Sequence, residues 1–194
     1  MKFLIVYSHP NPKSFNHAIL ETLTQELKIL KQEVVVRDLY EMNFDPVLKG
    51  SDLESFEKKN FPADIQKEQD HILWADILIF ICPIWWGSLT AQLRGYFDRV
   101  FSLNFAYAET EEGIKGLLSD KKSLFITTIG APENVYEQIG MFKSMNQTMD
   151  EVISDFCGMK MLKHKYFSSV GTCSYEERKS MLEDVKKLAR EMAG

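Results

Sequence analysis

The chain has 194 residues, of which 45% are hydrophobic and 26% charged, and its formal net charge is −5. This composition is typical of one globular domain over residues 1–194, and the negative charge argues against binding to nucleic acid, which requires clustered Lys and Arg. The three cysteines form no pair, and no apolar run reaches the length of a membrane span or a signal peptide. We therefore expect a cytoplasmic protein with no metal site and no membrane insertion.

Apolar runs with the pattern of buried parallel strands alternate with segments of helical periodicity. In chain order, we expect strands at residues 3–7, 34–36, 77–82 and 123–129, and a weaker one at 161–170. The intervals contain expected helices at about 14–31, 64–75, 89–101, 136–157 and 175–192, and expected loops at 43–62 and 104–120. This alternation predicts an α/β fold: a doubly wound, five-stranded parallel sheet of the flavodoxin-like kind, with strand order 2-1-3-4-5.

In an open parallel sheet, ligands bind beyond the carboxyl ends of the strands. The first loop at such an end, residues 8–16, contains prolines and small polar residues and leads directly into a helix. Ser14 or Asn16 can cap that helix and leave its first N–H groups free to bind an anion, and His9 is placed to donate a hydrogen bond to a phosphate. An ordinary helix cap without a ligand explains the same residues equally well.

The next two strand ends suggest where a flat ligand would lie. Trp85 and Trp86 follow the third strand, and adjacent side chains of an extended segment point to opposite faces, so that one of them is free to line a pocket. The loop at 127–130 offers backbone N–H donors. An anion site beside an aromatic wall suits a ligand with a phosphate tail and a planar head, such as FMN or FAD. Core packing of both tryptophans and a plain turn at 127–130 are the alternatives.

Several short motifs follow one another in a fixed order: Ser8-His9-Pro10 with Ser14-Phe15-Asn16, Asp38-Leu39-Tyr40 with Asn43-Phe44-Asp45-Pro46, Pro83-Ile84-Trp85-Trp86, the run from Gly95 to Phe101, Phe105-Ala106-Tyr107 and Thr127-Thr128-Ile129-Gly130. Together they resemble the NAD(P)H:quinone oxidoreductases, a family that includes DT-diaphorase, modulators of drug activity and potassium-efflux ancillary reductases. The resemblance extends from residue 2 to about residue 170.

The resemblance implies a homodimer with a flavin in each active site at the dimer interface. It assigns the flavin phosphate region to His9, Ser14, Phe15 and Asn16, one side of the flavin ring to Pro83, Ile84, Trp85 and Trp86, and the other side to Thr127, Thr128, Ile129 and Gly130. Two tyrosines are the expected catalytic residues: Tyr107 in the substrate pocket, and Tyr136, which matches a flavin-stabilising tyrosine of the family. Asp98 and Arg99 are expected to be a solvated or structural pair rather than catalytic residues.

The implied reaction is ping-pong: NAD(P)H passes a hydride to the flavin, and the flavin then passes both electrons to a quinone or another small acceptor. An azo- or nitro-compound reductase with the same flavin is one alternative, and a flavoprotein that regulates a membrane transporter is another. An electron-transfer flavodoxin is a weaker alternative, because its phosphate loop is normally rich in Thr and Ser.

The sequence departs from the family at several positions. Phe142 stands where DT-diaphorase has the histidine partner of the tyrosine matched by Tyr136, and Ile129 stands where a second glycine is usual. Glu109 replaces a second pocket tyrosine. The chain has no counterpart of the long C-terminal extension that contacts FAD in the mammalian enzymes, which favours FMN, with FAD as the alternative. His17, His71 and His164 are expected on the surface or on helices.

Overall fold

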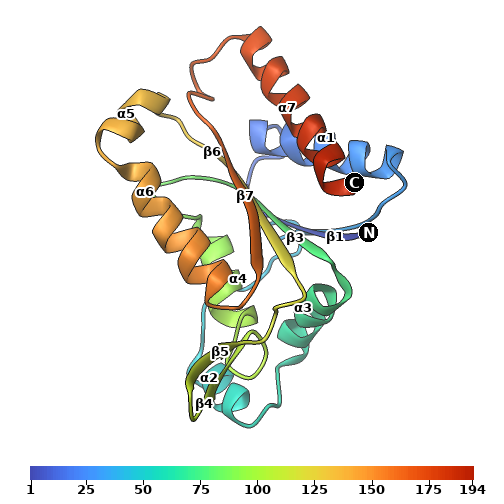
Figure 1. Ribbon diagram of the computed structural model, residues 1–194, viewed down its shortest axis with the longest axis vertical. Coiled ribbons are helices and arrows are strands. Elements are labelled where there is room, and N and C mark those ends of the chain that lie inside the picture. Colours follow the sequence, from blue (N-terminus) through green and yellow to red (C-terminus); the bar gives the residue numbers. More distant parts are fainter.

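A computed structural model describes all residues from 1 to 194 as a parallel sheet between helices, with a small separate hairpin (Figure 1). Its elements in chain order are β1 (Lys2–Tyr7), α1 (Phe15–Ile29), β2 (Glu33–Asp38), α2 (Gly50–Glu57), α3 (Ala63–Trp74), β3 (Ile77–Pro83), α4 (Ala91–Val100), β4 (Tyr107–Thr110), β5 (Gly113–Gly116), β6 (Lys122–Thr128), α5 (Glu133–Gln138), α6 (Met141–Met145), the π-helix η1 (Asn146–Asp155), β7 (Lys160–Phe167) and α7 (Tyr175–Ala193).

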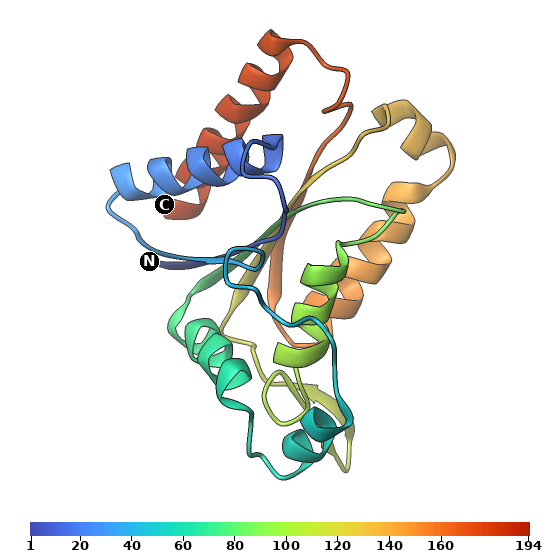
Figure 2. The ribbon, with the colours of Figure 1, turned by 180° about the vertical axis from the view of Figure 1, so that it is seen from behind.

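The five strands of the main sheet are parallel and lie in the order β2-β1-β3-β6-β7. This is the order 2-1-3-4-5 of the five expected strands, so the flavodoxin-like fold class is confirmed. Helices α1 and α7 cover one face of the sheet, and α3, α4, α6 and η1 cover the other (Figures 1 and 2).

Each face of the sheet has its own apolar core. Along β1, Phe3, Ile5 and Tyr7 pack with α1 and α7, while the intervening Leu4 and Val6 pack with the helices of the opposite face. Both sets are inaccessible to water, because a strand covered on both faces alternates its side chains between two interiors. The continuous apolar runs of the sequence follow from this burial.

Two expected loops contain regular structure. Helix α2 lies within residues 43–62, and the hairpin of β4 and β5 lies within residues 104–120. Only Asp52 and Phe56 of α2 are buried, and the hairpin strands are four residues each and exposed at their tip. Neither segment therefore has the apolar periodicity by which sequence analysis detects helices and strands.

The expected helix at 136–157 is broken in the structure. Gly140 has a φ of +70° and separates α5 from α6, which continues directly into η1. Glycine occupies this left-handed conformation without the steric cost that a Cβ imposes. The break turns α5 away from the axis of α6, so that Tyr136 lies on a separate short helix.

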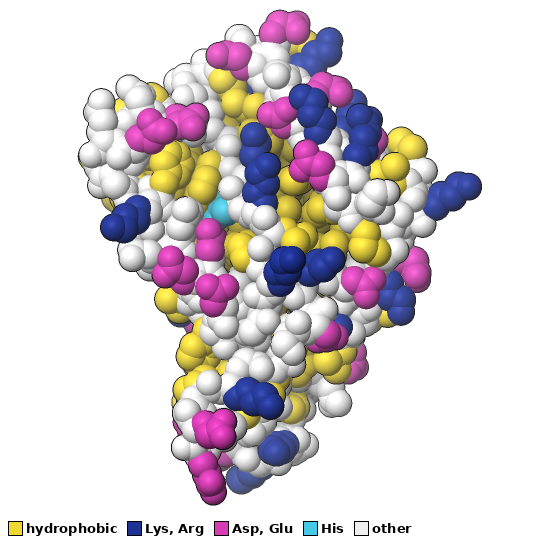
Figure 3. Space-filling model, viewed as in Figure 1, with side chains coloured by type: hydrophobic (Ala, Val, Ile, Leu, Met, Phe, Trp, Pro, Cys, Tyr) yellow, Lys and Arg dark blue, Asp and Glu magenta, His cyan; other side chains and the backbone are white.

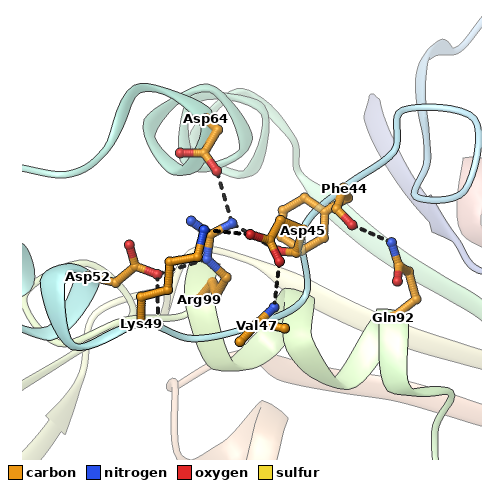
Figure 4. Close-up of polar contacts among 8 residues, drawn as sticks. All are labelled: Phe44, Asp45, Val47, Lys49, Asp52, Asp64, Gln92 and Arg99. Carbon is orange, nitrogen blue, oxygen red and sulfur yellow. Dashed lines mark hydrogen bonds and ion pairs between the residues drawn. The ribbon is translucent and has the colours of Figure 1, made fainter.

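Arg99 lies on α4, and its hydrogen bonds and ion pairs hold the segment around α2 against that helix (Figure 4). Its Nε donates to Asp52 Oδ2 at 2.9 Å, and its Nη1 donates to the Asp45 carbonyl and to Asp64 Oδ2, both at 2.9 Å. The side chains of Arg99 and Asp52 are 4% and 5% exposed, so this ion pair is buried. The structural role expected for Arg99 agrees with these contacts, whereas the neighbouring Asp98 forms an exposed pair with Arg94.

The same segment also touches the backbone of α4 directly. A Cβ built on Gly95 would lie 2.2 Å from the carbonyl oxygen of Pro46, closer than any real contact. One turn earlier, the Gln92 side-chain amide donates to the carbonyls of Leu39 and Phe44, and the second of these bonds is visible in Figure 4. Residues 44–52 are therefore packed tightly onto α4.

The outer strand β7 carries a row of lysines. Lys160 and Lys163 are exposed, Lys165 pairs with Asp184 of α7 at 3.3 Å, and basic side chains gather over β7 and α7 in Figure 3. Lysines on an edge strand oppose pairing with a strand of another molecule. None of the helices combines the length and apolar character needed to cross a bilayer.

Candidate functional site

Three loops at the carboxyl ends of β1, β3 and β6 form one continuous region, because these strands are neighbours in the sheet. We call residues 8–16, 83–88 and 127–131 the strand-end site. Backbone bonds join the loops: the Ser8 N–H donates to the Ile81 carbonyl at 2.9 Å, and the Ile84 N–H donates to the Thr128 carbonyl at 2.8 Å. A buried hydrogen bond of 2.6 Å also joins the Ser8 and Thr90 hydroxyls, and Thr90 caps α4.

The first loop ends at a conventional helix cap. Ser14 Oγ accepts from the His17 N–H at 3.1 Å, and Phe15 begins α1 with its ring packed edge-on against Phe167. Nδ1 of His9 lies 3.0 Å from the Asn11 N–H, which donates to it when the ring proton is on Nε2. Burial lowers the pKa of His9, so the ring is neutral at pH 7 and, in this tautomer, presents Nε2–H as a donor.

Asn16 has the clearest sign of a missing partner in this region. It is buried, and its Nδ2 donates to Thr128 Oγ1 at 2.7 Å, but its Oδ1 has no hydrogen-bond partner in the chain. A buried polar atom without a partner costs about 1–3 kcal/mol, so such atoms are rare unless a ligand or water satisfies them. This acceptor suits a hydroxyl or imino N–H of a ligand, groups that a flavin carries.

Trp85 and Trp86 lie in a tight turn rather than on an extended segment. The N–H groups of Trp85 and Ser88 each donate to the other residue's carbonyl at 3.1 Å, and the two residues between them, Trp86 and Gly87, have φ values of 54° and 69°. A positive φ is unusual for a bulky residue and occurs in tight turns and at functional sites. Trp86 is fully exposed, while the Trp85 ring lies 5.8 Å from that of His9. Pro83 and Ile84, in contrast, are buried.

The third loop divides its side chains between the two faces of the sheet. Thr128 faces Asn16, whereas Thr127 points to the opposite face, where its hydroxyl lies 2.9 Å from His164 Nε2. The Ile129 side chain is buried, and its N–H donates to the Phe167 carbonyl at 2.8 Å. The N–H groups of Gly130 and Ala131 have no partner in the chain, and space around Gly130 is open, so these two are the donors available to a ligand.

The two tyrosines expected to be catalytic lie far apart within one chain. Tyr136 is on α5, above the strand-end site, with its ring 5.7 Å from that of Phe142. Tyr107 begins β4, and the hairpin packs through Gly116 against Cys157 and Gly158, just before β7 begins. The hairpin therefore lies at the amino ends of the strands, about 20 Å from the carboxyl ends for a seven-residue strand such as β6.

Tyr107 lines a cavity of about 390 Å³ between α2, α4, the hairpin and η1. Its walls are mostly apolar, and the Tyr107 ring packs edge-on against Phe156 at 5.0 Å. The charged members of the wall, Glu57, Arg94 and Asp98, lie on α2 and α4.

The expectation that His164 is a surface or helix residue is wrong. His164 lies on β7, its side chain is only 3% exposed, and it contacts Thr127, Asp150 and Tyr166. The strand at 161–170 has a weak apolar pattern because lysines alternate with its inward residues. The two-residue spacing between His164 and Tyr166, the second of which is aromatic, is the sequence pattern that places both on an inner face.

Comparisons with known proteins identify relatives over nearly the whole chain. A family model described as flavodoxin-like fold matches residues 1–191. The chain is 37% identical over 185 residues to an uncharacterized NAD(P)H oxidoreductase of Haemophilus influenzae, with 94% of this chain and 91% of that protein covered. It is 33% identical over 204 residues to NAD(P)H dehydrogenase (quinone) 1 of Rattus norvegicus, with 95% and 74% covered.

A solved structure is similar over nearly the whole chain. The NAD(P)H:quinone oxidoreductase of Methanothermobacter marburgensis superposes with a TM-score of 0.90 at 28% identity, covering 99% of this chain and 98% of that one. The ordered motifs, the sheet topology and these relatives lead to the same assignment. The chain belongs to the flavodoxin-like NAD(P)H:quinone oxidoreductase family, as its motifs predicted, and it is an oxidoreductase.

Proposed function

We propose that this oxidoreductase binds FMN at the strand-end site and uses it to reduce a quinone with NAD(P)H. The observation that carries the proposal is the unpaired, buried Oδ1 of Asn16, which lies where the loops after β1 and β6 meet. The names of the rat and Methanothermobacter relatives support the electron donor and the acceptor. Three unpaired cysteines fit a reducing cytoplasm.

The chain's own groups divide the work of binding. A bound flavin supplies the capacity to accept and release a hydride, while the protein supplies position and electrostatics. In this proposal, the first N–H groups of α1 bind the phosphate together with Nε2 of His9, since a helix N-terminus attracts anions. Asn16 Oδ1 accepts a hydrogen bond from the ligand, and the N–H groups of Gly130 and Ala131 donate to the ring system.

The turn at Trp85 and Trp86 forms the wall for the ring. The backbone of Pro83 and Ile84 continues this wall into the sheet, with both side chains buried below it. Tyr136 lies on α5, which begins five residues after the end of β6. A planar ring bound between the tryptophan turn and the end of β6 would be partly removed from water, which would strengthen the hydrogen bonds made to it.

We further propose that the functional unit is a homodimer. Within one chain, Tyr107 lies about 20 Å from the strand-end site, as estimated from the strand length. A second copy is therefore required to place Tyr107 in a substrate pocket beside a flavin. The apolar cavity around Tyr107 and the exposed Leu53, Val152 and Phe156 near it supply the surface that such a contact buries.

The decisive test is an absorbance spectrum of the purified protein, followed by chromatography of the cofactor released by heat. We expect flavin peaks near-stoichiometric with the chain and FMN as the released species. NADH or NADPH oxidation is then measured with a quinone, an azo dye and a nitro compound as acceptors, and the quinone is expected to be reduced fastest. A colourless protein that takes up no added FMN would refute the proposal. Release of FAD would show that the cofactor is FAD and would leave the rest of the proposal standing.

Trp86→Ala is expected to raise the dissociation constant for FMN by about three- to tenfold, since ring stacking contributes about 0.5–1.5 kcal/mol. The free energy of unfolding of the apoprotein should change by less than about 0.5 kcal/mol, because Trp86 is fully exposed. FMN fluorescence quenching and urea unfolding measure the two quantities. Tyr175→Ala, which removes an exposed aromatic at the start of α7, is the matched control and should alter neither. Unchanged FMN binding by the Trp86→Ala variant would show that the flavin ring does not stack on Trp86.

A further inference from the structure

Behind the strand-end site, five side chains form a hydrogen-bonded polar cluster, which we call the His164 network; Thr127 and the His164 side chain are buried, whereas Asn146 lies exposed at its edge. His164 Nε2 lies 2.9 Å from Thr127 Oγ1, and His164 Nδ1 lies 2.9 Å from Asp150 Oδ1 and 2.8 Å from the Tyr166 hydroxyl. The Tyr166 hydroxyl also donates to Asn146 Oδ1 at 2.6 Å. The network thus joins β6, β7 and η1, and its imidazole stacks on Tyr166 with ring centroids 3.8 Å apart.

The hydrogen bonds of the network have one consistent assignment. Asp150, from η1, is the charged group that faces the imidazole; β6 presents the uncharged Thr127 and Phe125, and β7 presents Tyr166. Burial lowers the pKa of His164 more strongly than the Asp150 carboxylate raises it, so the ring is neutral at pH 7. Nδ1–H then donates to Asp150, Nε2 accepts from the Thr127 hydroxyl, and the Tyr166 hydroxyl donates to Asn146.

This arrangement leaves no group free for chemistry of its own. Thr127 is fully buried and His164 nearly so, and each polar atom of the imidazole has a partner. An Asp–His–hydroxyl chain of this kind activates a nucleophile only when the hydroxyl reaches a substrate. Any effect of the His164 network on the reaction is therefore exerted through the residues that it holds in place.

Two of these residues connect the network to other parts of the molecule: Thr127 to the end of β6, and Tyr166 to the α5–α6 segment. Thr127 immediately precedes Thr128, which holds Asn16 through a 2.7 Å bond, and lies three residues before the free N–H of Gly130. Tyr166 packs against Phe142 with ring centroids 4.8 Å apart, and Phe142 packs against Tyr136 of α5. Because α5 has no buried residue of its own, these contacts between tilted rings are among the few that locate it.

We propose that His164 is a positioning residue of the strand-end site, which fixes the end of β6 through Thr127 and the α5–α6 segment through Tyr166. This inference rests on the proposed function of that site as the flavin site. A satisfied buried network specifies one arrangement of its members, whereas apolar side chains in the same space would allow neighbouring packings. Two members of the network, Asn146 and Asp150, lie on the π-helix η1. Helical turns of this type occur frequently at functional sites.

The test is a double-mutant cycle on FMN affinity with Thr127→Val and His164→Asn. Asparagine keeps an amide near the position of Nδ1, facing Asp150, but does not reach Thr127; valine keeps the shape of threonine and removes its hydroxyl. Each single variant is expected to raise the dissociation constant for FMN about tenfold, and the double variant no further than either, since both break the same bond. His164→Gln, which places an amide near the position of Nε2, should restore most of the affinity.

The control is Lys163→Gln, on the exposed side of β7 next to His164, which should leave FMN affinity unchanged. Urea unfolding of each apoprotein separates positioning from folding. A fall in the unfolding midpoint with unaltered FMN affinity would overturn the inference, as would additive losses in the double variant. If the parent protein itself binds no FMN, the proposed function fails and the inference fails with it. If the parent binds FMN and the variants bind it with the same affinity, the positioning role of His164 is refuted while the proposed function stands.

Discussion

Replacing Arg99 with methionine is expected to lower the free energy of unfolding by about 3–5 kcal/mol, the cost of leaving one member of a buried ion pair unpaired. The Asp52 carboxylate is 5% exposed and loses its charged donor in this variant. The Asp45 carbonyl and Asp64 lose the same partner. The nearby Lys49 ammonium is paired with Asp45 rather than with Asp52, so we expect the segment of residues 44–52 to be held less firmly against α4.

Urea unfolding at pH 7 measures this loss, and two further variants test its cause. Arg94→Met removes an exposed pair with Asp98 on the same helix and should cost no more than about 1 kcal/mol. The double variant Arg99→Met, Asp52→Asn removes the buried charge as well, so it should recover part of the stability lost in the single variant. A loss below about 1 kcal/mol for Arg99→Met would show that the cluster in Figure 4 contributes little to folding.

The Ser14→Ala, Asn16→Ala double variant is expected to raise the dissociation constant for FMN by at least about 100-fold. Two hydrogen bonds to a charged or buried polar ligand group contribute about 1.5–3 kcal/mol each, and a loss of about 3 kcal/mol corresponds to this factor. The variant removes the cap that orders the first turn of α1 and the unpaired acceptor beside Thr128. Equilibrium titration with FMN, followed by fluorescence quenching, gives the change.

The control separates loss of the ligand from loss of a helix cap. Ser174 caps α7 as Ser14 caps α1, with its Oγ accepting from the Glu177 N–H, but it lies outside the strand-end site. Ser174→Ala should therefore cost a similar free energy of unfolding, about 1 kcal/mol, and leave FMN affinity unaltered. If the Ser14, Asn16 double variant binds FMN as tightly as the parent, the phosphate site is not at the start of α1.

The division between local and non-local information is visible at the binding loops. The positions of β1, β3 and β6 followed from their apolar runs, because strands buried on both faces must be continuously hydrophobic. Because these strands are neighbours in the predicted order, their carboxyl ends bring residues 8–16, Trp85 with Trp86, and residues 127–130 to one edge of the sheet. Sequence analysis did not show which atoms of these loops remain free, since the pairing of Ile129 with Phe167 is a contact between distant residues.

Tyr107 illustrates the same limit at the scale of the fold. Its motif indicated a role in a substrate pocket, but only the packing of Gly116 against Cys157 and Gly158 located it at the far end of the strands. This separation is the reason for proposing a second chain in the active site.

By itself, the sequence determined the strand order, the two-sided sheet, the family and the set of loops at the strand ends, because each depends on local apolar periodicity or on short motifs. Only the tertiary structure decided the helical state of residues 50–57, the burial of Arg99 with Asp52, and the position of His164 against Thr127 and Asp150. In each of these cases a polar side chain is stabilised by partners distant in the chain. Its burial therefore depends on satisfied hydrogen bonds and paired charges, which a one-dimensional pattern does not contain.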